Sequence, residues 1–382
     1  MDAAATTPVK PEVLRAMWPY LSEDFGNPSS RHALGEIAAR ALADARARVA
    51  AVLGCRSKEV MFTSGGTEGD NIAVKGIALA NPRGRHIVTT ATEHEAVLAS
   101  CDYLARHHGF EITYVQVDQY GTLQPELFEH ALRSDTSLCT VMLANNEVGT
   151  IQPVQELAMI ARSRRIPFHT DAVQAAGALE VNVEALGVDA LSLSGHKIGA
   201  PKGIGALFLR RRVDVEPVIH GGGQEYGRRS GTENVAAAVA FATALELSAA
   251  SREGRAARLR ELRDRLITGV LQDVPGAILT GHPTNRLPGH ASFCFAGTSG
   301  EAVLLALEER GILCSSGSAC AAGSDEPSHV LVAIGVPREL AQTAVRFSFG
   351  DDITDQQIDT VIRAAHDAVS TLTALHSNAR VI

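Results

Sequence analysis

Short apolar segments alternate with helical segments along the first half of this 382-residue chain. The apolar segments are as short as buried strands, and each is followed by a stretch with apolar residues at helical spacing. The predicted strands are Glu59–Thr63, His86–Thr90, Leu138–Leu143, Pro167–Thr170 and Ala190–Leu193. This alternation favours an α/β fold in which helices cover both faces of a mainly parallel sheet.

Polar side chains follow each of these predicted strands. Because ligands bind outside the carboxyl ends of the strands in open α/β sheets, we expect these groups to gather at one edge of the sheet and to form a ligand site there. The groups are Ser64, Gly65, Gly66, Thr67 and Glu68; Thr92, Glu93 and His94; Asn145, Asn146 and Glu147; Asp171 and Gln174; and Ser194, His196 and Lys197.

Lys197 is the candidate reactive amine. It lies in a tight polar turn after a predicted strand, and the glycine-punctuated loop Pro201–Gly205 follows it. An unperturbed lysine, with a pKa near ~10.4, is a poor nucleophile at neutral pH. Desolvation, or a neighbouring cation such as Lys202, lowers the pKa and frees the amine for Schiff-base chemistry with a carbonyl. A surface lysine in a loop is the alternative interpretation.

Three other strand-end groups suit an anionic, aromatic ligand. Ser64–Thr67 is a glycine-rich turn that opens a helix, so its free amides form an anion site, although the P-loop pattern is absent. Asp171 is a candidate partner for a protonated pyridine nitrogen or, alternatively, a cap of the next turn. His94 offers a flat ring for stacking, and a purely structural role is the alternative.

Two residues in the last third of the chain are further candidates. Arg346 lies between Val345 and Phe347, where a buried guanidinium needs a partner. That partner is either a ligand carboxylate or a structural acid in a buried ion pair. Cys320 ends a run of small residues that predicts a mobile loop, and an accessible thiol there is a candidate nucleophile. Cys314 is expected in the core instead.

Composition argues against several classes of partner. A formal net charge of -8 disfavours nucleic-acid phosphates, and the short cluster Arg210–Arg212 is expected on a solvated loop face. The six cysteines include no C-x-x-C pair, so we expect no metal site and a reducing compartment. The N-terminus lacks signal-peptide features, and the apolar run Val235–Leu245 is shorter than the ~20 residues that cross a bilayer. We therefore expect a cytoplasmic protein.

The sequence pattern of the chain changes near residue 250. Arg252–Leu271 has the charged amphipathic pattern of a helix that bridges two domains, and strand-like segments such as Val345–Phe349 follow it. The sequence therefore predicts a large α/β domain over residues 12–250. A smaller α+β domain is expected to comprise residues 1–11 and 251–382.

Seven motifs, in order over nearly the whole chain, resemble the cysteine desulfurases. This family belongs to the aspartate-aminotransferase-like group (fold type I) of pyridoxal phosphate enzymes. The motifs are T-S-G-G-T-E-G-D-N (63–71), T-E-H (92–94), A-N-N-E-V-G-T (144–150), H-T-D-A-V-Q (169–174), S-L-S-G-H-K (192–197), G-G-G-Q-E-Y-G-R-R-S-G-T-E-N (221–234) and S-S-G-S-A-C (315–320). The last motif resembles the branch of the family with a longer cysteine-bearing loop.

The resemblance implies a role for each candidate residue. Lys197 would carry pyridoxal 5'-phosphate, and Asn146 and Arg346 would hold the substrate carboxylate. The other cofactor contacts would be Asp171 at the ring nitrogen, Gln174 at the ring oxygen, His94 stacked on the ring, Gly66, Thr67, Ser194 and His196 at the phosphate, and Thr232 at the phosphate of the partner subunit. A homodimer with shared active sites follows from the last contact.

The resemblance also implies the reaction. L-cysteine would displace Lys197, the Cys320 thiolate would attack the substrate's sulfur, and L-alanine and a persulfide on Cys320 would remain. Lys197 and His94 would move the protons. The persulfide would pass to an acceptor protein for iron–sulfur assembly, RNA or DNA modification, or cofactor sulfuration. A selenocysteine lyase, an aminotransferase and a non-catalytic scaffold are the alternatives.

Three positions depart from the family pattern. Ala3 stands where asparagine is usual, Ala200 where glycine is usual, and Tyr226 where arginine is common. None of them has an assigned catalytic role. Tyr226 is expected to alter the dimer-facing edge of the site.

Overall fold

The central element of the fold is a seven-stranded sheet with the strand order β1-β7-β6-β5-β4-β2-β3. The computed structural model describes residues 1–316 and 326–379. All strands are parallel except β7, which runs antiparallel to its neighbours β6 and β1. The strands are β1 (Val60–Thr63), β2 (His86–Thr90), β3 (Glu111–Val115), β4 (Thr136–Thr140), β5 (Phe168–Asp171), β6 (Ala190–Ser194) and β7 (Gly205–Leu209). The predicted mainly parallel sheet is confirmed.

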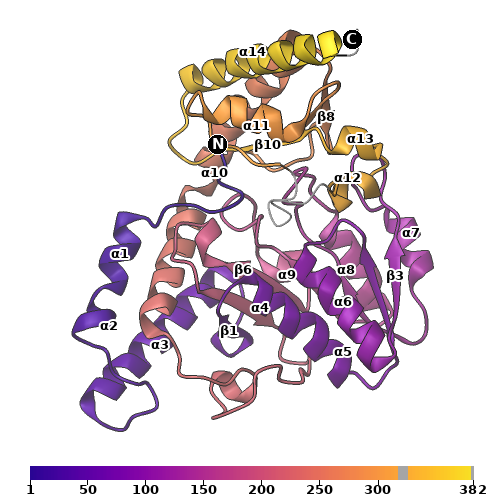
Figure 1. Cartoon of the computed structure of the whole chain (residues 1–382). Coiled ribbons are helices and arrows are strands. Elements are labelled where there is room, and N and C mark those ends of the chain that lie inside the picture. Colours follow the sequence, from indigo (N-terminus) through magenta and orange to yellow (C-terminus); the bar gives the residue numbers. More distant parts are fainter. Residues whose placement is uncertain (317–325, 380–382) are drawn as a thin grey trace.

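Helices cover both faces of this sheet, as the alternation predicts (Figure 1). Val88 of β2 belongs to the core beneath α3, α8 and the start of α10, whereas the preceding Ile87 belongs to the core beneath α4 to α6. The helices of this part are α1 (Pro11–Met17), α2 (Pro19–Ser22), α3 (Ala33–Leu53), α4 (Gly66–Asn71), α5 (Ile77–Ala80), α6 (Glu95–His108), α7 (Pro125–Ala131), α8 (Val154–Ser163), α9 (Val183–Leu186) and α10 (Val235–Asp273).

A second, antiparallel sheet has the order β10-β9-β8 and forms the centre of the smaller part (Figure 1). Its core contains α11 and α14 together with the second half of α10. Its elements are β8 (Ala277–Thr280), β9 (His290–Phe295), α11 (Gly300–Glu308), α12 (His329–Ala333), α13 (Arg338–Ala341), β10 (Ala344–Ser348) and α14 (Asp355–Ala379). The N-terminus joins this sheet through a parallel bridge between Asp2 and Ser348.

The helix expected at Arg252–Leu271 begins earlier, because α10 runs without interruption from Val235 to Asp273. Its first half packs in the core of the large sheet and its second half in the core of the small sheet. The domain division at residue 250 therefore falls inside one helix and stays an interpretation, which the two cores support. Among the described residues, α10 alone is long and apolar enough to cross a membrane, but 61% of its most apolar window is buried inside the protein.

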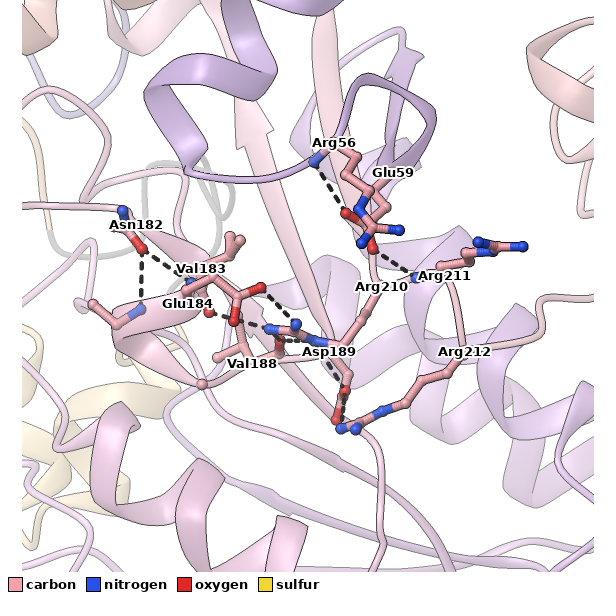
Figure 2. A network of polar contacts seen from close by, with 12 residues as sticks. Arg56, Glu59, Asn182, Val183, Glu184, Val188, Asp189, Arg210, Arg211 and Arg212 are labelled. Carbon is pink, nitrogen blue, oxygen red and sulfur yellow. Dashed lines mark hydrogen bonds and ion pairs between the residues drawn. The ribbon is translucent and has the colours of Figure 1, made fainter.

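The cluster Arg210–Arg212 fixes the edge of the sheet at which β6 begins (Figure 2). Arg210 donates to Glu184 Oε1 at 2.7 Å, and Arg212 donates to the buried carboxylate of Asp189 at 2.8 Å. Asp189 in turn accepts a hydrogen bond from the main-chain N–H of Phe168 at 3.2 Å. Arg210 is therefore a half-buried anchor of the sheet rather than part of a solvated loop face.

Candidate active site

The strand ends converge on one cavity, as predicted. The cavity has a volume of about 1390 Å³ and receives residues from the carboxyl ends of β1, β2, β4, β5 and β6 and from β10 of the small sheet. Ten of the twelve predicted site residues line it. They are Gly66, Thr67, His94, Asn146, Asp171, Gln174, Ser194, His196, Lys197 and Arg346.

Lys197 ends a single 3₁₀ turn, Gly195–Lys197, directly after β6. Its Nζ donates to the main-chain oxygens of Ala4 at 2.5 Å and Ala5 at 2.8 Å. Gln174 Nε2 donates to the same Ala4 oxygen at 2.9 Å. The N-terminal segment thus forms part of the cavity wall and positions two predicted cofactor residues. No local sequence pattern predicts these contacts.

The predicted phosphate cup lies where the helical run from Gly66 to Ala80 begins. The backbone at Gly66 is closely covered, because a Cβ atom there would lie 2.5 Å from Val173 Cγ2. Unpaired amides at a helix start favour an anion. Burial, followed by the charges of Lys197 and Lys202, lowers the pKa of His196 to about 4, so this imidazole is neutral at neutral pH. Its Nδ1 lies 3.2 Å from Thr6 Oγ1.

Asp171 is buried at the end of β5. Its Oδ1 accepts a hydrogen bond from the main-chain N–H of Val173 at 2.8 Å, so the turn-capping interpretation is correct as well. Burial raises the pKa of Asp171, and the nearby charge of His94 opposes that rise. A cationic ring nitrogen in the cavity would favour the ionised form of this carboxyl.

Asp70 is a second buried carboxyl in the cavity that the sequence interpretation missed. It lies on α4 one helical turn after Gly66, and its Oδ1 has no hydrogen-bond partner among the described residues. Burial and the charge of Asp171 raise its pKa well above the usual value. His169 Nε2 is 3.6 Å away, but burial lowers the pKa of His169 to about 3, so this histidine is neutral. A buried carboxyl oxygen without a hydrogen-bond partner among the described residues leaves room for a cationic ligand.

His94 caps the start of α6, where its Nδ1 accepts a hydrogen bond from the main-chain N–H of Ala96 at 3.1 Å. This bond fixes the plane of the ring. It also assigns the proton of the neutral imidazole to Nε2.

Arg346 is only 2% exposed, and the structure shows one of the two predicted kinds of partner, a structural acid. Its Nη1 donates to the main-chain oxygen of Asn146 and its Nη2 to Asp2 Oδ1, each at 3.0 Å. His290 Nε2 lies 3.1 Å from the same Asn146 oxygen. Burial lowers the pKa of His290 to about 3, so a neutral His290 donates that bond. Arg346, which lines the cavity, therefore also forms a structural ion pair with Asp2.

Two predicted site residues remain. Thr232 is exposed and does not line the cavity of its own chain. Cys320 lies outside the described residues. Within residues 1–316 and 326–379, no group of three or more His, Cys, Asp or Glu side chains has an arrangement that holds a metal ion.

A mainly parallel sheet covered by helices, with a lysine at the carboxyl end of β6 and an arginine of the small sheet lining one cavity, has the architecture of an aminotransferase-type α/β protein. The sequence profile of the aminotransferase class-V family matches residues 1–361. The chain is 48% identical to a cysteine desulfurase IscS of Methanosarcina thermophila over 373 residues, which cover 97% of this chain and 92% of that protein. It therefore belongs to the cysteine desulfurases within the class-V aminotransferase family.

Solved structures agree with this assignment. A NifS-like protein superimposes with a TM-score of 0.90 at 37% sequence identity, covering 97% of this chain and 99% of that chain. SspA in complex with cysteine superimposes with a TM-score of 0.80 at 36% identity, covering 91% of this chain and 97% of that chain. Cysteine desulfurases of this family are pyridoxal phosphate enzymes. The cavity suits that cofactor, because a lysine, the predicted phosphate cup and Asp70, whose Oδ1 has no hydrogen-bond partner among the described residues, lie together.

Proposed function

We propose that this enzyme removes sulfur from L-cysteine and leaves L-alanine and a persulfide on Cys320. The observation that carries the proposal is the single cavity that contains Lys197, Asp171 and Arg346. A relative whose structure holds cysteine supports the choice of substrate. Bound pyridoxal phosphate would supply an electron-withdrawing ring that weakens the substrate's carbon–sulfur bond.

Lys197 would hold the cofactor aldehyde, Asp171 would keep the ring nitrogen protonated, and Gln174 would bind the ring oxygen. Gly66, Thr67, Ser194 and His196 would bind the phosphate. A neutral His196 suits this task as a hydrogen-bond donor. His94 would stack on the ring.

Arg346 and Asn146 would hold the substrate carboxylate. Lys197 Nζ would take the proton from the substrate's Cα. The Nε2 proton of His94 would be available to the substrate where the bond between Cβ and sulfur breaks. The Cys320 thiolate would then bond the substrate's sulfur as its bond to Cβ breaks. Protonation of Cβ, and the return of a proton from Lys197 Nζ to Cα, would complete L-alanine.

An acceptor protein would take the sulfur from Cys320, and the IscS names of the relatives favour iron–sulfur assembly as its destination. Thr232 would contact the phosphate bound by a partner subunit, which makes the enzyme a homodimer with shared sites. Five cysteines among the described residues are free thiols, which supports a cytoplasmic location.

Replacing Cys320 with alanine tests the reaction. We expect the cofactor's visible absorbance to stay and alanine release from cysteine to fall by more than about 10³-fold, because the attacking thiolate is gone. Cys314→Ala is the control. Burial raises the pKa of Cys314 to about 12, so that thiol is unreactive and its loss should leave turnover intact. Turnover that survives Cys320→Ala would instead favour an aminotransferase reaction.

A further inference from the structure

We propose that Asp2 is a positioning residue that orients the Arg346 guanidinium for the substrate carboxylate. The inference rests on the proposed role of Arg346 and adds a residue that acts through it. Asp2 and Arg346 are 344 positions apart in the sequence, yet Arg346 Nη2 donates to Asp2 Oδ1 at 3.0 Å. The Asp2 side chain is 27% exposed, whereas that of Arg346 is 2% exposed.

The geometry of Arg346 leaves a defined part of the guanidinium for a ligand. Nη1 is engaged by the Asn146 oxygen and Nη2 by a single oxygen of Asp2. Nε is buried and has no hydrogen-bond partner among the described residues. A guanidinium carries five N–H groups, and Asn146 and Asp2 engage one N–H on each Nη, so the second N–H of Nη1 and of Nη2 remains for a carboxylate. Asp2 and a substrate therefore use different N–H groups.

Asp2 is itself held firmly. Its Oδ2 accepts a hydrogen bond from Ser315 Oγ at 2.8 Å. Ser348 of β10 donates to the Met1 oxygen at 2.9 Å and accepts from the Ala3 N–H at 3.1 Å, so the backbone on both sides of Asp2 is bonded to the strand that carries Arg346 (Figure 1). A second main-chain contact, from Arg346 N–H to the Ser315 oxygen at 2.7 Å, completes the frame.

A positioning role follows from this frame, because a free arginine side chain loses considerable rotamer freedom when it binds a ligand. A carboxylate fixed by Ser315 and β10 holds the guanidinium in one orientation before substrate arrives, which lowers the entropy lost on binding. The opposite role is competition, in which Asp2 occupies the place of the substrate carboxylate. The single-oxygen contact and the N–H groups that stay unengaged on Nη1 and Nη2 argue against competition.

The test compares Asp2→Ala with Asp2→Asn in the enzyme loaded with pyridoxal phosphate. We expect Asp2→Ala to raise the KM for L-cysteine about tenfold with little change in kcat. Asp2→Asn should raise it less, because the amide oxygen still accepts from Nη2. Inhibition separates this role from a general structural one: the KI of L-alanine should rise with the KM, whereas that of L-alaninamide, which lacks the carboxylate, should change by less than about twofold.

A double variant and a charge control make each outcome decisive. In an Arg346→Ala enzyme, Asp2→Ala should add nothing, because Asp2 acts only through Arg346. Glu12→Ala, which removes an exposed acid paired with Arg15, is the matched charge control. A KM that falls in Asp2→Ala, equal effects on alanine and alaninamide, or additivity with Arg346→Ala would overturn the inference. An unchanged KM in Arg346→Ala alone would refute the proposed role of Arg346 instead.

Discussion

At the scale of single residues, three buried acids lie in or next to the site. Asp70, Glu93 and Asp171 are all buried, and burial raises the pKa of each of them. Asp171 is the acid assigned to the cofactor ring, and Asp70 lies in the same cavity. Glu93 differs, because both its oxygens accept hydrogen bonds from the protein: Oε1 from Thr90 Oγ1 at 2.8 Å and Oε2 from the Met142 N–H at 2.9 Å. The protonation of Glu93 therefore affects the stability of the fold.

Glu93 predicts a pH-dependent stability. Burial raises the pKa of Glu93 from 4.5 to about 8. Below pH 4.5 the folded and unfolded chains both hold the proton, and the contribution of the neutral side chain to stability is complete. As the pH rises from 4.5 through 8, the unfolded chain releases the proton first, so the free energy of unfolding falls. We expect Glu93→Gln to remove this part of the fall, as measured by urea unfolding at pH 5 and pH 8.5.

Glu129→Gln is the control for the Glu93 experiment. Glu129 is an exposed partner of Arg164, so its loss should change the stability little at either pH. Burial is the main cause of the raised pKa values of Asp70 and Asp171, and it is the same in wild type and variant, so most of the difference in slope comes from Glu93. Identical pH slopes for wild type and Glu93→Gln would show that Glu93 is ionised in the fold.

At the scale of elements, the sequence predicted what local spacing determines. Helix α3 shows this local control, because it ends where Gly54 has the left-handed φ of 70° that a glycine permits. Asp70 was within reach of the same logic, because a residue four positions after Gly66 shares its helix face. β3 was missed because only one of its five residues is buried and its pattern lacks an apolar run.

Contacts between distant segments were beyond any such pattern. The Ala4 and Ala5 oxygens reach Lys197 across more than 190 positions, and they act through the backbone, which carries no residue-type signal. The sequence predicted that a buried Arg346 needs an acidic partner, but it did not identify Asp2 as that partner. The start of α10 was misplaced because a run of alanines and valines satisfies a strand, a core helix and a hydrophobic segment equally.

Helix α10 gives an element-scale prediction, since it joins both cores and contains two glycines in contrasting surroundings. Gly254 is exposed, and a Cβ atom there would meet nothing within 4 Å. Gly254→Ala should raise the free energy of unfolding by about 0.5–1 kcal/mol, because alanine loses less backbone entropy in a helix. Chemical denaturation of the holoenzyme measures the change.

Gly269 in the same helix predicts the opposite sign. A Cβ atom there would lie 2.4 Å from Ile362 Cδ1 and 3.1 Å from its Cγ1, at the contact between α10 and α14. Gly269→Ala should lower the stability by about 1–3 kcal/mol. Adding Ile362→Ala to Gly269→Ala should cost less than the sum of the two single changes. Stabilisation by Gly269→Ala would mean that α14 is free to move away from α10.

At the scale of the whole molecule, Thr232 was assigned to the site but does not line the cavity of its own chain. The loop before it is held by Arg46, which donates to both carboxylate oxygens of the buried Glu225, at 2.5 Å and 2.9 Å. Tyr226, one of the departures from the family pattern, lies exposed in the left-handed region with its ring over Arg46 at 5.2 Å. The loop is therefore fixed on its own subunit while Thr232 faces outward, as a shared site requires.

Shared sites predict complementation between two impaired subunits. In a heterodimer of Lys197→Ala and Thr232→Ala chains, one site combines an intact Lys197 with the intact Thr232 of its neighbour. If chains mix randomly, half of the dimers are of this kind, so about a quarter of the wild-type sites should be restored. Desulfurase activity at limiting pyridoxal phosphate, measured on co-expressed chains with two purification tags, reports this recovery.

The matched control mixes Lys197→Ala with Asp171→Asn chains. Both residues line the cavity of the same subunit, so every site in that heterodimer lacks one of them and no activity should return. Recovery in the Thr232 mixture alone places Thr232 in the neighbouring subunit's site, because only a residue supplied across the interface separates the two mixtures. No recovery in either mixture would mean that each subunit binds its cofactor without Thr232 of its neighbour, and the exposed position of Thr232 would then have no catalytic meaning.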